Sequence, residues 1–510
     1  MSLKISYKET QYYSRFILDY LDEDKKLRPF VDSFPSFNNF KKKIESQKYR
    51  HINRDILVKV LKRQNDYLSL SKCTKENIDL LRMDTSFTVT TGHQLCLFTG
   101  PLYFMYKIIS SINLCEQLNE SYPSKRFIPF FWMASEDHDF TEINHIHLFR
   151  KKIEWNTNQN GPVGRMSLDG FERVINELKL ALGSHKNAEK VISIFQDSYL
   201  HNNNLSDATR HLVNELFGDY GLVIIDGDDK DLKRQFVPQM KKDILHRGFV
   251  DTINNCTNNL SKNYRPQAFI RDINFFKLSD GGRELIKKDV IEQEIDENPE
   301  LFSPNVLLRP LYQETVLPNI AYVGGGSEIA YWLQLKTAFE QEGIPFPILI
   351  LRNSALLLDE KQHNQISENL GFQLEDIFLS EDELHKRYVL TNSNEGMSFK
   401  NEKDDLDLLY QNISLKTSDV GLKKSIEAQL QKHHSFLDNM QKKIIRIEKK
   451  KHQVAINRIS KLKRHLFPYD ALQERYDSFI PYYLKDGDNF IKRLKNNLDP
   501  LNPNFVVLTL

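Results

Sequence analysis

The sequence predicts an α/β protein with a mostly parallel sheet at its core and a long α-helical arm. An extended run at Ser86–Thr90, and apolar runs suited to buried strands at Phe127–Met133 and Phe346–Leu351, alternate with segments of helical spacing. Strands that alternate with helices are typical of a parallel sheet. From about Phe378 onward this alternation ends, and a heptad pattern of apolar residues follows.

The composition is that of an ordinary globular protein. Of the 510 residues, 40% are hydrophobic and 27% are charged, and the net charge of +1 favours neither nucleic acid nor an acidic membrane as a partner. The first residues lack an apolar signal region, and no apolar run approaches the ~20 residues that span a bilayer. The four cysteines form no CxxC pair, so we expect a cytoplasmic protein without disulfides.

The residue pattern divides the chain into four parts. Before the first strand, Phe16–Tyr20 and Ile56–Leu68 have helical spacing among charges. The apolar, extended residues Phe505–Leu510 are expected to dock on the core. The expected parts are an N-terminal helical layer at 1–80, a core at 81–377 with insertions near 148–218 and 236–300, a coiled-coil arm at 378–467, and a C-terminal segment at 468–510 that returns to the core.

The first stretch that resembles a ligand-binding site contains two breaks in the secondary-structure pattern. The first strand ends at Gly92–Gln94, and Thr99–Pro101 is predicted to open a helix with Thr99 as its N-cap. On that helix Tyr103 and Lys107 are four residues apart, so their side chains can face one ligand.

Two further stretches place polar residues or glycines after buried strands. The run Phe127–Met133 ends in Ser135–Asp139, and the carboxyl ends of buried strands are where open α/β sheets bind ligands. The strand Ile320–Val323 runs into Gly324–Gly326, and a helix is predicted from Ser327. Glycines let the backbone approach a ligand closely, and a helix N-terminus favours an anion.

The arm is predicted to be a coiled coil. Its seam has alternating four- and three-residue spacing at Ile426, Leu430, His433, Leu437, Met440, Ile444, Ile447, Lys451 and Val454. Residues 421–465 carry 13 Lys or Arg against 3 Asp or Glu, which suits a solvated helix surface or contacts with phosphate. We expect a helix near Leu406–Leu415 to cover part of the seam and a second copy of the arm to cover the rest, which gives a homodimer.

Four motifs carry a family resemblance: TGHQLCLFTGPLYFMYK, FWMASEDHDFTEINH, LPNIAYVGGGSEIAYWLQ and LKNNLDPLNPNFVVLTL. In order and spacing, over nearly the whole chain, they resemble the cysteine ligases of bacillithiol biosynthesis. The resemblance implies a Rossmann-like core with inserted connecting segments and a coiled coil that pairs two subunits. It also implies addition of cysteine to glucosaminyl-malate as the last step in making the thiol. Finally, it implies an ATP or ADP ligand, associated with the region where the arm meets the core.

The motifs and the resemblance together define candidate site residues. A histidine after a strand can donate to a developing negative charge or orient a phosphate, and acids or histidine can serve as a base for an attacking amine. Arg309 or Arg352 is expected to hold the malate carboxylates. The expected catalytic residues are His93, Lys107, Glu136, His138 and Asp139. The expected substrate-binding residues are Gly92, Gln94, Gly100, Tyr103, Arg309, Tyr322, Gly324, Gly325, Gly326, Ser327 and Glu328.

Other chemistries are compatible with the same residues. Cys96, between Leu95 and Leu97, is expected to be buried rather than a catalytic thiol. The chain has no GxxxxGK[ST] phosphate loop, so a nucleotide would bind at Gly92–Gln94, at Gly324–Ser327 or at the junction of arm and core. Residue types that can bind a metal occur close together without the spacing of a zinc motif, so no metal is predicted. They are Asp137, His138, Asp139, Glu142, His145 and His147.

Two other functions fit the sequence less directly. One is a non-catalytic coiled-coil dimer that binds a nucleotide or a thiol. The other is a metal-dependent hydrolase that works from the Glu136–Asp139 cluster.

Overall fold

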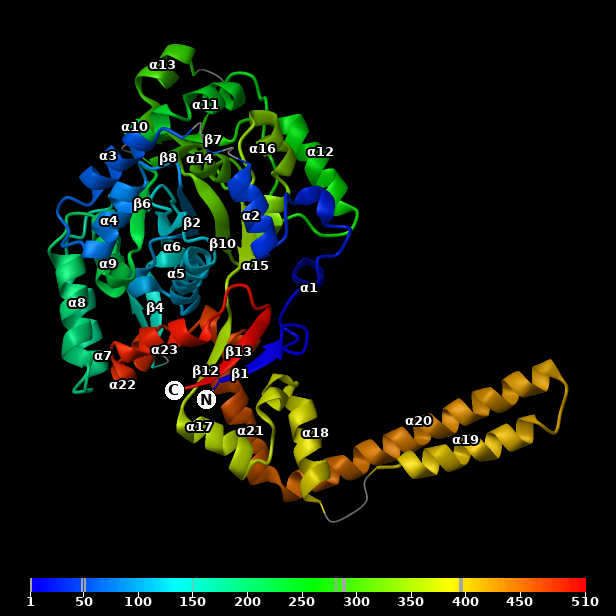
Figure 1. Ribbon diagram of the computed structural model, residues 1–510. Coiled ribbons are helices and arrows are strands. Elements are labelled where there is room, and N and C mark those ends of the chain that lie inside the picture. Colours follow the sequence, from blue (N-terminus) through cyan, green and yellow to red (C-terminus); the bar gives the residue numbers. More distant parts are fainter. Residues whose placement is uncertain are drawn as a thin grey trace.

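A parallel five-stranded sheet lies at the centre of the body (Figure 1). The computed structural model describes residues 2–46, 49, 52–149, 151–279, 282–286, 290–393 and 398–510. All neighbouring strands of the sheet are parallel. Their spatial order is β11 (Ile348–Leu351), β10 (Asn319–Gly324), β2 (Ser86–His93), β3 (Arg126–Met133) and β6 (Val223–Asp226).

The strand order makes the sheet Rossmann-like. Numbered along the chain and read from β6, the order is 3-2-1-4-5, so the direction of winding reverses between β2 and β10. A ligand crevice forms at such a switch point, outside the carboxyl ends of the strands. The strands are buried along nearly their whole length because helices cover both faces. This arrangement confirms the predicted α/β class.

Helices from several parts of the chain cover the sheet. The longest of them, α5 (Tyr103–Ser121), connects β2 to β3. The N-terminal layer comprises α1 (Arg15–Leu21), α2 (Phe37–Glu45), α3 (Arg54–Gln64) and α4 (Lys72–Leu80). Around β10 and β11 lie α14 (Arg309–Val316), α15 (Gly326–Leu333) and α16 (Lys336–Glu342).

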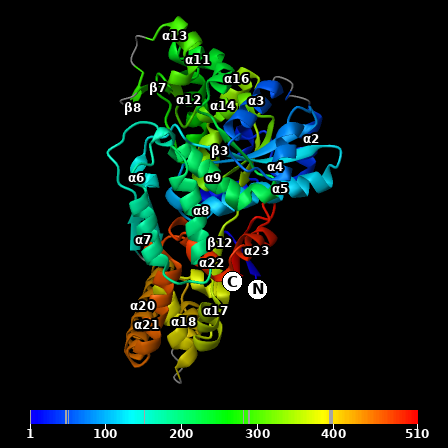
Figure 2. The ribbon, with the colours of Figure 1, turned by 90° about the vertical axis from the view of Figure 1, so that its left-hand side faces the viewer.

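The inserted segments add helices and two small sheets to the body. On the side facing away from the arm lie α7 (Glu172–Leu182), α8 (Ala188–Leu200) and α9 (Leu205–Phe217) (Figures 1 and 2). A hairpin precedes them, formed by β4 (His145–Leu148) and β5 (Lys151–Glu154). After β6 come α10 (Lys230–Arg234), α11 (Val237–Ile244), α12 (Val250–Ser261), β7 (Phe275–Ser279), β8 (Gly282–Leu285), α13 (Glu292–Glu297) and β9 (Phe302–Pro304).

A second sheet ties the ends of the described chain together. Its middle strand, β13 (Asn504–Thr509), pairs antiparallel with β1 (Ser2–Ser6) and parallel with β12 (Ala355–Leu358). The residue pattern predicted only helices before the first core strand, so β1 is an element that the sequence did not indicate. Only Ile5 is fully buried in β1, so the sequence there lacks the alternation of apolar and polar residues that indicates a strand.

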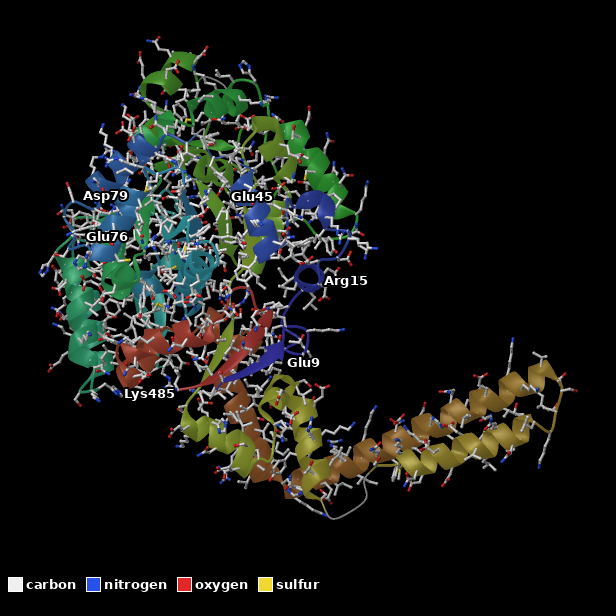
Figure 3. The ribbon with its side chains drawn as sticks, in the orientation of Figure 1. Glu9, Arg15, Glu45, Glu76, Asp79 and Lys485 are labelled. Carbon is white, nitrogen blue, oxygen red and sulfur yellow. The ribbon has the colours of Figure 1, made fainter. Side chains whose placement is uncertain are left out.

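The arm is a helical hairpin that projects from the body (Figures 1 and 3). Its helices α19 (Lys400–Ser414) and α20 (Val420–Lys451) are joined by the ion pairs Lys403–Asp438 and Asp407–His434. At its base lie α17 (Glu360–Asn364), α18 (Glu381–Asn392) and α21 (Gln453–Leu466). The helices α22 (Ile480–Asp486) and α23 (Asn489–Asn497) pack on the body, against α8 and α5. Among the described helices, none is both long and apolar enough to cross a bilayer.

Candidate active site

A cavity of about 850 Å³ opens at the carboxyl end of the parallel sheet, at the switch point between β2 and β10. We call its inner part the floor (Gly92, His93, Tyr103, Lys107, Arg309, Tyr322 and Glu328) and its outer part the rim (Glu136, Asp137, His138 and Asp139). Every residue predicted to act in catalysis lines this cavity, as do the expected substrate-binding residues Gly92, Gln94, Tyr103, Arg309, Tyr322 and Glu328.

The glycine turn after β10 lies behind the floor and does not line the cavity. A Cβ on Gly324 would come within 2.9 Å of the Tyr322 ring, so this glycine permits close packing. The amide of Gly325 donates to the Glu328 carboxylate at 2.9 Å, so the start of α15 is capped from within the chain. The cavity lining likewise excludes Gly326 and Ser327.

The turn before α5 differs from the predicted capped helix start. Thr99 and Gly100 both have positive φ, and α5 begins at Tyr103 after Leu102 without a side-chain cap. Thr99 as N-cap was therefore wrong. A Cβ at Gly100 would lie 2.7 Å from that of Cys96, so Gly100 allows a tight turn and does not line the cavity.

A buried ion pair joins the two halves of the floor. The Lys107 ammonium donates to both Glu328 oxygens, at 2.7 and 2.9 Å, and to the carbonyl of Gly92. The Tyr322 hydroxyl donates to the same carboxylate at 2.5 Å. Burial alone would raise the pKa of Glu328, but Lys107 and these hydrogen bonds lower it to about 2. Lys107 thus fixes the end of β2 against α15.

Arg309 is the cation of the floor that remains available to a ligand. Its guanidinium donates to Gln313 at 3.0 Å and to the Tyr331 hydroxyl at 3.2 Å. No carboxylate pairs with it in the described part of the chain. Arg352, the other arginine considered for malate, instead pairs at 2.7 Å with the fully buried Glu474 and lies outside the cavity lining.

His93 lies on the floor between aromatic rings. Its ring centroid is 5.2 Å from that of Tyr103 and 5.0 Å from that of Phe104, and its Nδ1 lies 2.9 Å from the Gln94 carbonyl oxygen. Burial, with the nearby Lys107 charge, lowers the pKa of His93 to about 3, so the ring is neutral near pH 7. The neighbouring Cys96 is buried, and burial raises its pKa to about 12, as expected for a thiol without a catalytic role.

On the rim, Glu136 is paired with a lysine that the sequence did not single out. The Lys233 ammonium is fully buried and lies 2.6 Å from Glu136 and 3.1 Å from Asp228. It also donates to the Glu300 carbonyl at 3.0 Å. Burial lowers the pKa of Lys233, but the two carboxylates outweigh this effect and raise it. No spacing rule links Lys233 to Glu136, because α10 meets β3 only in the folded protein.

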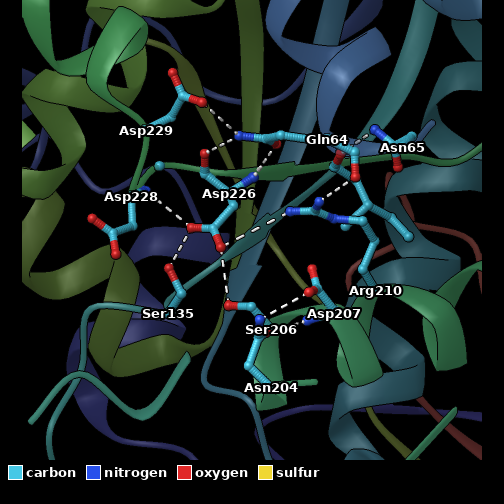
Figure 4. A network of polar contacts seen from close by, with 12 residues as sticks. Gln64, Asn65, Ser135, Asn204, Ser206, Asp207, Arg210, Asp226, Asp228 and Asp229 are labelled. Atoms are coloured by element: carbon cyan, nitrogen blue, oxygen red, sulfur yellow. Dashed lines mark hydrogen bonds and ion pairs between the residues drawn. The ribbon is translucent and has the colours of Figure 1, made fainter. Parts of the chain in front are cut away.

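The acids after β6 brace the sheet from behind the rim (Figure 4). The Asp226 carboxylate accepts hydrogen bonds from the hydroxyls of Ser135 and Ser206 and from the amide of Asp228. Gln64 of α3 exchanges two hydrogen bonds with the Asp226 backbone, each 2.9 Å long. These contacts hold the carboxyl ends of β3 and β6 together, so this acidic run has a structural explanation.

The remaining rim residues form a cluster at the mouth. The side-chain amide of Gln94 donates to the Asp137 carboxylate at 2.8 Å. The guanidinium of Arg283 in β8 donates to His138 Nδ1 at 3.4 Å. Ligand atoms of Asp137, His138 and Asp139 lie within 4.8 Å of one another, as a metal site requires. The Arg283 guanidinium faces the same group and supplies positive charge there. Arg283 comes from an insertion whose structure the sequence left unresolved.

A second cavity, of about 610 Å³, lies where the arm meets the body. The His147 and Tyr476 rings stack in its wall with centroids 4.1 Å apart. Arg464 at the end of α21 lines the same wall, as does Lys485 of α22, whose ammonium lies 3.2 Å from the Asp359 carboxylate.

Comparison with known proteins gives matches along the whole chain. A family model described as "Bacillithiol biosynthesis BshC, N-terminal Rossmann-like domain" matches residues 1–353, and one described as "Bacillithiol biosynthesis BshC, C-terminal coiled-coil domain" matches residues 355–510. A Flavobacterium psychrophilum protein named "Putative cysteine ligase BshC" is 42% identical, over 99% of this chain and 98% of its own. Proteins of the same name from Flavobacterium johnsoniae and Bacillus cereus are 40% and 26% identical, over 99% and 94% of this chain and 99% and 95% of their own.

Proposed function

Since the chain belongs to the BshC family of bacillithiol biosynthesis, we propose that it is a cysteine ligase acting in the last step of that route. In this reaction the carboxyl group of cysteine forms an amide with the amine of glucosaminyl-malate. The four cysteines are all free, which suits work in the reducing cytoplasm.

The observation that carries this proposal is the half-buried Arg309 on the floor of the switch-point cavity, which has no carboxylate partner among the described residues. Both substrates carry carboxylates, and an arginine fork binds a carboxylate through two parallel hydrogen bonds. Lys107 is already saturated by Glu328 and Gly92, so Arg309 is the floor residue suited to this task. The cavity volume of about 850 Å³ falls in the range of small-molecule sites.

The direct test is product formation by the purified protein. Cysteine, glucosaminyl-malate and ATP are supplied together and then omitted one at a time, and the thiol product is measured by mass spectrometry. Product that needs all three components supports the ligase. Absence of product from the complete mixture, with protein that is folded and binds its ligands, favours the non-catalytic binding function instead.

We further propose that the cavity between arm and body binds a nucleotide. The stacked pair His147–Tyr476 offers an aromatic face for a base, and Arg464 offers charge for phosphates. Calorimetry with ADP tests this, with Tyr476→Ala as the variant and Tyr67→Ala, which is distant from this cavity, as the control. A loss of affinity confined to Tyr476→Ala supports the junction as the site.

Homodimerisation through the arm is part of the same proposal. In the hairpin, α19 covers one side of α20. Apolar side chains stay exposed at Phe436, Met440 and Ile447 of α20 and at Val454 of α21. A second arm is the simplest cover for them. Sedimentation of Ile447→Asp/Val454→Asp is a sharper test than changes at Leu437 or Ile444, because those two are half-buried within the chain. A wild type that is monomeric at micromolar concentration contradicts the dimer.

A further inference from the structure

The hydrogen bond of the His93 ring fixes which of its nitrogens carries the hydrogen. Nδ1 lies 2.9 Å from the Gln94 carbonyl oxygen, and a carbonyl oxygen can only accept. Nδ1 therefore donates, and Nε2 keeps its lone pair. Within the described residues no side chain or amide donates to Nε2. Because His93 lines the cavity, this nitrogen is an acceptor that a ligand can use.

The surroundings keep the ring in this neutral form. Burial and the Lys107 charge disfavour the imidazolium, while the Glu328 carboxylate is committed to Lys107 and cannot offset them. The pKa of about 3 leaves the acceptor intact throughout the physiological range. The titratable and charged groups that face the ring are Cys96, Tyr103, Lys107, Glu328 and Arg352.

Glu328, the carboxylate of the floor, offers a ligand no comparable acceptor. Glu328 already receives hydrogens from Lys107, from the Tyr322 hydroxyl and from the Gly325 amide. On the adjoining rim, Glu136 is paired with the buried Lys233. Among the floor residues defined above, His93 Nε2 is therefore the acceptor that can orient an N–H of an attacking amine.

We propose that His93 accepts a hydrogen bond from the attacking amine through Nε2, and that it does not act as a donor to phosphate or to an oxyanion. This proposal rests on the proposed ligase function, with a cysteine carboxyl activated by a nucleoside triphosphate. As the nitrogen–carbon bond forms, the bond between the acyl carbon and the phosphate-class leaving group breaks, and the leaving group keeps the electron pair. Nε2 orients the nitrogen through the hydrogen bond, and the nitrogen's proton leaves to solvent water, because burial and the Lys107 charge disfavour the imidazolium.

Three variants separate an acceptor from a donor. His93→Phe keeps a ring between Tyr103 and Phe104 but removes the acceptor. His93→Gln keeps an amide oxygen near the Nε2 position. His201→Phe, at an exposed histidine, is the matched control. Calorimetry measures the affinity of each protein for glucosaminyl-malate and for ADP.

We expect His93→Phe to weaken glucosaminyl-malate binding about tenfold, the size of one good hydrogen bond. His93→Gln should recover most of this loss, and ADP binding should not change in either variant. Nitrogen-15 NMR of the wild type should show His93 as the Nδ1–H tautomer without titration between pH 5 and pH 8. The NMR result does not depend on how the variants fold.

An Nε2–H tautomer, or weaker ADP binding with unchanged glucosaminyl-malate binding in His93→Phe, would overturn the proposal. Failure of this inference is distinct from failure of the ligase function. Product formation by the wild type together with normal glucosaminyl-malate binding by His93→Phe rejects the acceptor role and keeps the ligase. A wild type that neither binds glucosaminyl-malate nor forms product rejects both.

Discussion

Two glutamates at opposite ends of strand β10 differ in charge. Glu314, just before the strand, is fully buried and accepts hydrogen bonds from Asn319 and Gln313 at 2.8 and 2.7 Å, and burial raises its pKa to about 8. Glu328, just after the strand, has a side chain that is 26% exposed. Desolvation would raise its pKa as well, yet Lys107 and its hydrogen bonds lower it to about 2. Desolvation alone therefore does not decide the charge of these two acids; the partner does.

The difference separates the amino end of the sheet from the carboxyl end. At the amino end, neutral amides and the hydroxyls of Thr88 and Thr90 hold Asn319 and Glu314 in a polar contact without ions. At the carboxyl end, the ion pair of Glu328 creates a charged floor. The ionised end is the one that faces the cavity, where a fixed charge can orient a polar ligand.

The largest effect is expected from Lys107→Met. This change leaves the Glu328 carboxylate, whose side chain is 26% exposed to the cavity, without its cation. Breaking a fully buried pair costs about 3–5 kcal/mol, and solvent at Glu328 places the expected loss at the lower end, about 3 kcal/mol. The free energy of unfolding in urea measures it. Lys190→Met, which removes an exposed ion pair with Asp488, is the control and should change little. A loss in Lys107→Met no larger than in the control would show that the floor does not depend on this pair.

The next effect concerns Glu314→Gln. A folded-state pKa of about 8, above the unfolded value of 4.5, means that the wild type loses stability as the pH rises from about 4.5 to about 8. Glutamine keeps the oxygen that accepts from Asn319 but cannot ionise. The variant should therefore be more stable than the wild type by about 3 kcal/mol at pH 7 and equal to it near pH 4. Parallel stability curves for the two proteins would contradict the raised pKa.

At the other end the pH dependence has the opposite sign. Because the folded-state pKa of Glu328 is about 2 and the unfolded value is 4.5, its contribution is complete above about pH 4.5 and is lost as the pH falls toward 2. Compared with Lys107→Met/Glu328→Gln, the wild type should lose about 2 kcal/mol more over that range. Acid unfolding monitored by circular dichroism measures the difference, and an equal loss in both proteins would refute it.

The smallest effect is expected on the rim. Asp139 is half-exposed and its described contact is a 3.9 Å approach to His138, so Asp139→Asn should change the free energy of unfolding by no more than about 0.5 kcal/mol. A fall in product formation with intact stability would then assign Asp139 to the reaction. A large loss of stability in Asp139→Asn would show that the rim, like the floor, contributes to the free energy of unfolding.

Elements with a clear local pattern could be predicted from the sequence. Strands β2, β3 and β10 were found from their extended or apolar runs. His93 and Glu136 line one cavity because parallel strands share their carboxyl ends. Partners from distant segments were not predictable. Lys233 reaches Glu136 only through the folding of an insertion. The glycine turn after β10 indicated a site for an anionic ligand, but the Glu328 side chain of this chain pairs with Lys107 there.

The sheet β1–β13–β12 has a consequence for biosynthesis. Its middle strand comes after both of its neighbours along the chain, so on the ribosome β1 and β12 exist before the strand that joins them. Until β13 emerges, each neighbour presents an unpaired backbone edge, which is the kind of surface that pairs with other chains. A nascent chain stalled before residue 504 would carry a formed α/β core with two open strand edges, a form suited to recognition by chaperones.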